Sequence, residues 1–337
     1  MDKPTVAPTQ ASGSSAGAIE PNLPIVDCHH HLWHPHVARY FTDQFCADIQ
    51  ASGHNVQATV YVECSVMLRK SGPEHLKPTG EAEFAAGMAA MSESGTFGTS
   101  RICAGYVGAA DFKLGRKVEE VLQALNLASG GRLRGIRGTA NWDVDPLVNS
   151  GSRPFAPPGL LANSEYRAGV TRLGELDLAY DAWQYYPQTA ELCELADACP
   201  NVRMVVNHCG GLLGVHGYAT ADNFSKWRSQ IAEAAKRPNL HMKLGGLAGT
   251  RNGFGYASRD MRPTLDELVA DWRPYLSTCI ELFGPDRCMF ESNWPVDSIG
   301  CDYQRLWNVY KTITSDYSAG EREKLFSDNA KKFYRVP

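Results

Sequence analysis

The sequence predicts an α/β protein and, within that class, a (β/α)8 TIM barrel made by a single domain. Short β-forming runs alternate with amphipathic helical stretches, and no two predicted strands are joined by a hairpin, which is typical of a parallel sheet. A chain of 337 residues suits one such barrel. A doubly wound open sheet is the alternative, but no glycine-rich dinucleotide fingerprint follows the first strand. We expect the barrel over residues 23–337, after a flexible tail over residues 1–22 that is rich in small and polar residues.

The individual elements follow from the spacing of apolar residues and from turn signals. The predicted strands are Leu23–Asp27, Gln57–Glu63, Arg101–Val107, Leu133–Arg137, Leu176–Ala182, Val202–Val206, Leu240–Leu244 and Arg287–Ser292. The predicted helices are Gln44–Ser52, Glu81–Ser94, Val118–Ser129, Gln188–Ala198, Ala221–Lys236, Thr264–Phe283, Cys301–Thr314 and Ala319–Tyr334.

A long insertion rich in proline and glycine follows the fourth strand, over Thr139–Arg172. Loops of this length inside compact domains are commonly lids or substrate walls, although a peripheral loop is the alternative. We expect the insertion to cover the mouth of the barrel, where Trp142 and Phe155 would supply apolar contact to a ring.

Composition excludes several classes of partner. The net charge of −4 provides no basic field for nucleic acid and no polybasic membrane patch. No run approaches 18 consecutive apolar residues, so we expect no membrane span. Ten cysteines are scattered without a CxxC pair, which indicates reduced core residues of a cytoplasmic protein. A small molecule is the expected partner, and the sequence carries no signal of oligomeric state.

The end of the first strand carries the strongest chemical signal, in the run Asp27–His31. Side chains alternate along a strand, so we expect His29 and His31 on one face and Cys28 and His30 on the other. Two imidazoles at this spacing are a pair of metal ligands or proton carriers.

Other polar or aromatic residues stand at the ends of later strands. In a barrel these ends meet at one mouth, which is where TIM-barrel active sites lie. Arginine and histidine together at a mouth suit an anionic or oxygen-rich substrate. The residues at these positions are Glu63, Arg137, Trp183, Tyr185, His208 and Asn293.

Several motifs together resemble those of the amidohydrolase superfamily, and more narrowly of its amidohydrolase 2 branch, which contains sugar lactonases and pyrone-dicarboxylate lactonase. The resemblance covers about residues 23–336, and its first and eighth-strand motifs are the most specific. The matching motifs are Val26–Trp33, Arg134–Arg137, Tyr180–Asp181 with Trp183, Val206–Gly210, Lys243–Leu247, Met289–Val296 and Asn329–Tyr334.

The resemblance implies roles for single residues. His29 and His31 match the family's HxH pair, and His208 matches its sixth-strand histidine. The family's eighth-strand aspartate, which activates water, is replaced by Asn293. An amide cannot take a proton from water and is a poor metal ligand, so a metal-free site is slightly favoured. The alternative is one divalent ion, zinc or manganese, on the three histidines; a two-metal centre is not expected.

A compensating carboxylate is available two residues before Asn293. Glu291 lies on the same face of the eighth strand, one step deeper in the barrel, where it would reach water or form an ion pair with Lys243. The ion pair is the favoured interpretation. Asp297 is a further candidate base, on a loop beyond the strand.

These observations predict a hydrolase that opens a lactone or related cyclic ester of a carboxylated or hydroxylated small molecule. The alternatives are a decarboxylase of an aromatic or muconate-type acid, with or without a metal ion, and a barrel that binds ligand without turnover. The predicted catalytic set is His29, His31, His208, Asn293, Glu291 and Asp297. The predicted substrate-binding set is Arg137, Glu63, Trp183, Tyr185 and Lys243.

Overall fold

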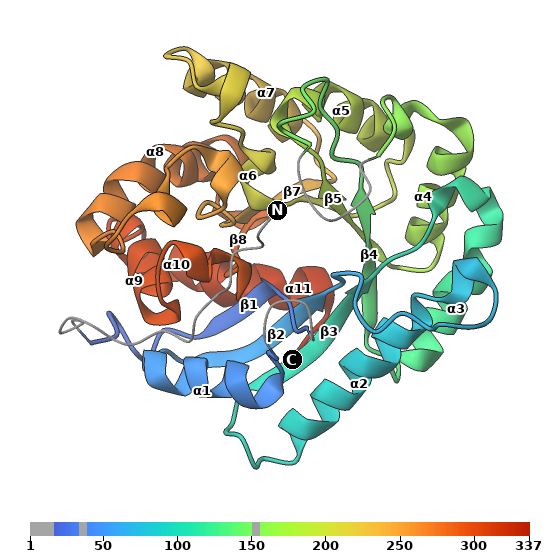
Figure 1. The fold of residues 1–337 in the computed structure, drawn as a ribbon, viewed down its shortest axis with the longest axis horizontal. Coiled ribbons are helices and arrows are strands. Elements are labelled where there is room, and N and C mark those ends of the chain that lie inside the picture. Colours follow the sequence, from blue (N-terminus) through green and yellow to red (C-terminus); the bar gives the residue numbers. More distant parts are fainter. Residues whose placement is uncertain (1–16, 34–38, 150–155) are drawn as a thin grey trace.

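Eight parallel strands in sequential order form the centre of the molecule, and helices surround them (Figure 1). The structure is a computed structural model that describes residues 17–33, 39–149 and 156–337. The strands are β1 Ile25–His30, β2 Val56–Val62, β3 Arg101–Gly108, β4 Leu133–Thr139, β5 Ala179–Trp183, β6 Met204–Val206, β7 Leu240–Leu244 and β8 Cys288–Phe290. The predicted (β/α)8 barrel is confirmed, with strand ends that differ from prediction by up to three residues.

The ring closes between β1 and the segment that follows β8. The backbone N–H of Asn293 donates to the carbonyl of His29 at 2.9 Å, and that of His31 donates to the carbonyl of Trp294 at 2.7 Å. The buried carboxylate of Asp27 reinforces this seam, because it accepts hydrogen bonds from the backbone and hydroxyl of Ser292 and from the hydroxyl of Tyr303. Burial raises the pKa of Asp27 to about 6, against the lowering effect of these bonds.

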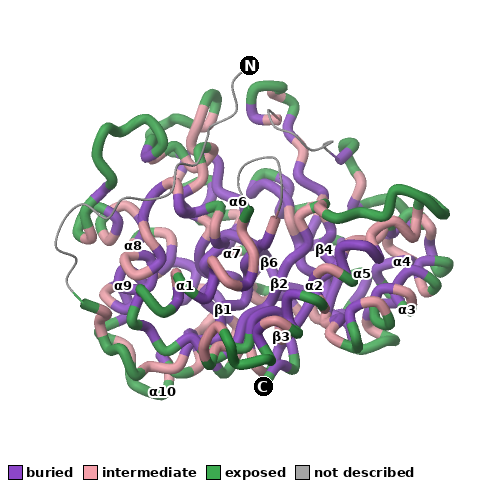
Figure 2. Tube along the Cα trace, turned by 60° about the horizontal axis from the view of Figure 1, so that its bottom comes forward, coloured by how far each residue is buried: buried purple, intermediate pink, exposed green. Residues whose placement is uncertain are grey.

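The helices form the outer layer and pack apolar residues against the strands. Figure 2 shows the strands buried, with exposed positions on the surrounding helices and loops. The α-helices are α1 Thr42–Ser52, α2 Thr79–Glu93, α3 Val118–Ala128, α4 Ser164–Glu175, α5 Thr189–Ala198, α6 His208–Gly211, α7 Asn223–Ala235, α8 Leu265–Phe283, α9 Tyr303–Ile313, α10 Ala319–Glu323 and α11 Asn329–Tyr334. Short helical turns connect them, among them η3 Leu160–Ala162, η5 His216–Tyr218 and η9 Val296–Ile299. The predicted last helix is interrupted by a π-helical segment, η10 Lys324–Asp328.

A second, smaller core fills the barrel itself. Its strand residues alternate with those that face the helices, and α11 packs against β1 and β8 to contribute aromatic rings from the end of the chain. The set includes Val26, Cys28, Val60, Val107, Ala179, Met289, Phe333 and Tyr334. The floor of the barrel is therefore largely apolar, and polar groups inside it need partners within the protein.

The predicted alternation along the first strand is wrong at Cys28. The pairing of β1 with β2 shifts between Asp27 and His30, where β1 carries one residue more than its partner. Cys28 consequently lies in the barrel core, on the same side as His29. His30 faces outward as predicted, against the ring of Phe45, and its Nε2 bonds the hydroxyl of Thr59.

The predicted insertion is shorter than expected, because α4 occupies its last part as the regular barrel helix after β4. Trp142 is half-buried, and its backbone is fixed by the side chain of Gln188 at 2.9 Å. Phe155 lies outside the described residues. The role of the insertion as a wall over the mouth remains a prediction.

Of the predicted tail, residues 1–16 lie outside the described part. The segment that follows is held against the barrel: Glu20 pairs with Arg322 at 2.7 Å, and its carbonyl accepts from Lys311 at 2.8 Å. Among the described residues, no helix is long and apolar enough to cross a membrane. All ten cysteines are described and all are free thiols.

We expect Asp27→Ala to lower the free energy of unfolding by about 2–4 kcal/mol, because it leaves three buried donors at the barrel seam without their acceptor. The matched control is Asp43→Ala, which removes an exposed pair with Arg39 and costs less than about 1 kcal/mol. Urea denaturation measures both values. Equal losses for the two variants would show that the seam does not depend on this carboxylate.

Candidate active site

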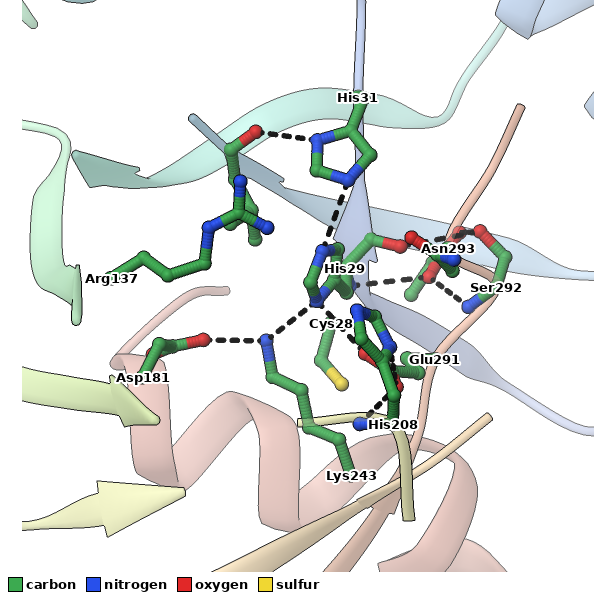
Figure 3. Close-up of polar contacts among 12 residues, drawn as sticks. Cys28, His29, His31, Arg137, Asp181, His208, Lys243, Glu291, Ser292 and Asn293 are labelled. Atoms are coloured by element: carbon green, nitrogen blue, oxygen red, sulfur yellow. Dashed lines mark hydrogen bonds and ion pairs between the residues drawn. The ribbon is translucent and has the colours of Figure 1, made fainter. Parts of the chain in front are cut away.

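Three imidazoles meet at the carboxyl ends of the strands (Figure 3). His29 comes from β1, His31 follows it, and His208 begins the turn after β6. The Nε2 atoms of His29 and His31 lie 3.2 Å apart, and the ring centres of His29 and His208 lie 4.7 Å apart. The predicted convergence of these histidines is therefore present in the structure.

Glu291 holds the lower edge of this cluster. Its Oε1 accepts from Nδ1 of His208 at 2.7 Å and from the backbone N–H of the same residue at 3.0 Å. Its Oε2 lies 2.9 Å from Nδ1 of His29 but makes no aligned hydrogen bond. The carboxylate is fully buried, so a buried carboxylate–imidazole pair lies one step below the mouth.

The predicted ion pair between Glu291 and Lys243 is wrong. Lys243 pairs instead with Asp181 of β5, at 2.7 Å, and Tyr334 of α11 donates to the same carboxylate. The register of β7 and β8 places Lys243 beside Met289, so Glu291 lies higher in the barrel. Burial alone would lower the pKa of Lys243, but the charge and hydrogen bond of Asp181, together with the charge of Glu291 and the nearby Cys28, raise the pKa above its ordinary value.

Hydrogen-bond partners define the state of the other two imidazoles. Burial and then the positive charge of Lys243 lower the pKa of His29 well below its ordinary value, so its ring is neutral. Nδ1 of His31 lies 2.8 Å from the carbonyl of Val62, which can only accept. The proton of a neutral His31 is therefore on Nδ1, and its Nε2 carries a lone pair.

Asn293 and Asp297 form a separate pair behind the histidines. Asn293 has a left-handed backbone with φ of 49°, and its Nδ2 donates to Oδ1 of Asp297 at 2.8 Å. Asp297, in η9, is fully buried, and burial raises its pKa to about 7. This carboxylate is better fixed than a loop position suggested, but it points at Asn293 and has no access to solvent.

Four of the five predicted substrate-binding residues lie at or just beyond the ends of β2, β4 and β5, whereas the fifth, Lys243, is buried deep in the barrel on β7. Arg137 and Glu63 form a buried ion pair at 2.7 Å, and Arg137 also donates to the carbonyl of Glu63. Trp183 is half-buried and presents its ring to His208, with centres 4.9 Å apart. The hydroxyl of Tyr185 accepts from Asn141 at 3.3 Å, so that side chain is buried in the wall.

A cavity of about 670 Å³ opens beside the imidazole cluster. Glu63 and Arg137 form its boundary toward the cluster, and Asp111, Phe112 and Leu160 line its outer part. The histidines and Glu291 do not line it. The cavity therefore adjoins the reactive groups across the Glu63–Arg137 pair.

Two glycines after β7, which our sequence analysis did not select, make room for the cluster. A Cβ on Gly245 would lie 2.6 Å from Cγ of Glu291, and one on Gly246 would lie 2.3 Å from Nδ1 of His208. Gly246 also has φ of +64°. The signal in the sequence was the Gly-Gly pair directly after the strand that carries Lys243.

The cluster fits a single divalent ion. His29, His208 and Glu291 offer ligand atoms within 4.8 Å of one another, and Nε2 of His31 approaches that of His29. The deep carboxylates of Asp181 and Glu291 outnumber the single ammonium of Lys243, so the surroundings favour a cation. Imidazole and carboxylate ligands suit zinc.

The fold and the site together define a TIM-barrel enzyme with a histidine–carboxylate centre at its mouth. The sequence pattern of the amidohydrolase family matches residues 26–336. The chain belongs to the amidohydrolase family and is a hydrolase. This match confirms the resemblance drawn from the motifs.

Individual relatives cover almost the whole chain. The uncharacterized protein y4mH of Sinorhizobium fredii is 30% identical, over 94% of this chain and 99% of its own. The L-fucono-1,5-lactonase of Burkholderia multivorans is 25% identical, over 93% and 96%. The crystal structure of an amidohydrolase from Burkholderia multivorans with bound zinc superimposes with a TM-score of 0.70 at 21% identity, covering 93% of this chain and 99% of that one.

We expect Gly246→Ala to lower the free energy of unfolding by about 2–5 kcal/mol, because the new methyl group meets the His208 ring and the backbone is left-handed. The matched control is Gly217→Ala, where no atom lies within 4 Å of the added Cβ, with a change within about 0.5 kcal/mol. Thermal and urea unfolding check both. An unaffected Gly246→Ala protein would mean that His208 is free to move away.

Proposed function

We propose that the enzyme hydrolyses a lactone, or a related cyclic ester, of a small carboxylated or hydroxylated molecule. The observation that carries the proposal is the hydrogen-bonded pair formed by His208 at the barrel mouth and Glu291 beneath it. The similarity to an L-fucono-1,5-lactonase supports the same class of substrate. We also propose that the enzyme is cytoplasmic.

His208 is the group proposed to take the proton from water. Because Glu291 only accepts, its short bond to Nδ1 places the imidazole proton there and leaves the lone pair on Nε2. The carboxylate also stabilises the imidazolium that forms when Nε2 takes a proton, as in other histidine–carboxylate pairs. A positioned base of this kind contributes about 10²–10⁴-fold to the rate.

Polarisation of the substrate carbonyl is assigned to His29. It lies beside His208 and is shielded from water, where a hydrogen bond to a developing oxyanion is strong, whereas the proton of His31 is engaged by the carbonyl of Val62. A divalent ion held by His29, His31 and His208 would act as a Lewis acid at the same place. The loss of a carboxylate at position 293 does not argue against such an ion, because the charge of Glu291 lies beneath His29 and His208 and would offset that of the ion.

Substrate recognition is assigned to the rim. Arg137 uses Nε and one terminal nitrogen on Glu63, and its other terminal nitrogen has no protein partner among the described residues. That group suits a substrate carboxylate or hydroxyl, and the adjoining cavity has room for the rest of the molecule. Trp183 would cover the ring of the lactone.

We expect His208→Ala to lower lactone turnover by about 10²-fold or more while the protein stays folded. The matched control is His216→Ala, an exposed histidine on η5, which should retain full activity. A panel of sugar and aromatic lactones, followed with a pH indicator, measures acid release. Carbon dioxide release in place of acid would identify a decarboxylase. No turnover of any substrate would favour ligand binding without catalysis.

We expect Asn293→Asp, which restores the family residue, to be destabilised by about 1–3 kcal/mol at pH 8 relative to pH 5, beyond any change in the wild type. The new carboxylate would lie against Asp297. The pair holds a proton in the folded state at a raised pKa, so this stability is present at low pH and lost as the pH rises.

The control for this change is the exchanged pair, Asn293→Asp with Asp297→Asn, which keeps one carboxylate and one amide in contact. It should recover most of the stability at pH 8. Melting temperatures of the three proteins at both pH values decide the matter. Identical pH dependence in the wild type and the single variant would show that the two side chains do not share a proton.

A further inference from the structure

Nδ1 of His29 lies between a donor and an acceptor. The ammonium of Lys243 lies 3.3 Å from it, and Oε2 of Glu291 lies 2.9 Å from it (Figure 3). All three side chains are fully buried. Water therefore cannot replace either partner, and the surrounding protein determines which of the two forms a hydrogen bond with Nδ1.

The two partners require different tautomers of the same ring. A neutral imidazole carries one proton, and an ammonium can only donate, so a bond from Lys243 requires Nδ1 to be bare and places the proton on Nε2. A carboxylate can only accept, so a bond to Glu291 requires the proton on Nδ1 and leaves Nε2 bare. A metal ion at Nε2 needs the second tautomer.

The contact with His31 indicates which tautomer this arrangement holds. The Nε2 atoms of His29 and His31 are 3.2 Å apart, and in a neutral His31 the Nε2 atom carries the lone pair, because Nδ1 faces the carbonyl of Val62. A contact of this length between two lone pairs would be repulsive, so the proton lies on Nε2 of His29. Oε2 of Glu291 lies 2.9 Å from Nδ1 of His29 but out of line for a hydrogen bond from it, which agrees with a proton on Nε2 rather than on Nδ1.

We propose that Lys243 is a positioning residue that holds His29 in the tautomer with the proton on Nε2, and so weakens the binding of divalent metal ions at the mouth. Asp181 and Tyr334 fix the ammonium from the barrel floor. For an ion to bind at Nε2 of His29, the proton of the ring moves from Nε2 to Nδ1. Nδ1 then donates a hydrogen bond to Glu291 and no longer accepts one from Lys243. The inference rests on the proposed function in one respect only, which is that this cluster is the active centre.

The test is nuclear magnetic resonance of histidine labelled with nitrogen-15, on chelator-treated protein, together with zinc affinity measured by chelator competition. The variant is Lys243→Met with Asp181→Asn, which removes both charges of the buried pair and keeps an acceptor for Tyr334. In the wild type, His29 should show its proton on Nε2. In the variant the proton should move to Nδ1, and zinc should bind at least about tenfold more tightly, because the donor that opposes the metal-competent tautomer is gone.

The matched control is Lys311→Met. Lys311 is also a buried lysine that contacts Nδ1 of a histidine, His54, at 3.0 Å, away from the mouth. The Lys311→Met variant should bind zinc with the same affinity as the wild type. A proton on Nδ1 of His29 in the wild type, an unchanged zinc affinity in the variant, or a gain in the control equal to that of the variant would each overturn the proposal.

If the double variant fails to fold, the wild-type spectrum still decides the tautomer. Neither readout uses a lactone, so an enzyme with a different substrate would contradict the proposed function and leave this inference standing.

Discussion

The buried carboxylate of Glu291 is the constraint on which the centre depends. An ionised carboxylate without water is costly unless hydrogen bonds or charges compensate it. This one is compensated by two bonds from His208 and by the nearby rings and ammonium of the cluster. The packing of Glu291 against His208 requires glycine at positions 245 and 246, because any side chain at either position would overlap Glu291 or His208. The left-handed backbone of His208 is held by the same bonds.

Under the proposed function, this constraint accounts for the amide at position 293, where the family resemblance leads us to expect an aspartate. Glu291 does not reach the mouth itself, since it is fully buried beneath His208. In the proposed function its charge acts through the imidazole, so the proposed base stands at the end of β6 and not at the end of β8. The barrel seam around Asn293 is then free for a structural role, with its amide bonded to Asp297 and its backbone to β1.

Sequence patterns predicted the barrel and the meeting of His29, His31 and His208, because strand periodicity and strand ends are local signals. They did not predict the features that depend on contacts between residues far apart in the sequence. The extra residue in β1 moved Cys28 inward, and nothing in the run Asp27–His31 indicates which residue is added. The partner of Lys243 was misassigned because a charge inside a barrel can pair across it, here with Asp181 of β5. Tyr334, near the end of the chain, reaches that pair only through the fold.

A double-mutant cycle on kcat/KM tests most directly whether His208 and Glu291 act as one unit. The proteins are wild type, His208→Ala, Glu291→Gln and the double variant, measured on the best substrate of the lactone panel. If Glu291 acts through His208, the double variant is no slower than His208→Ala, because the carboxylate has nothing left to orient. Losses that multiply, so that the double variant falls by the product of the two single effects, would contradict the account.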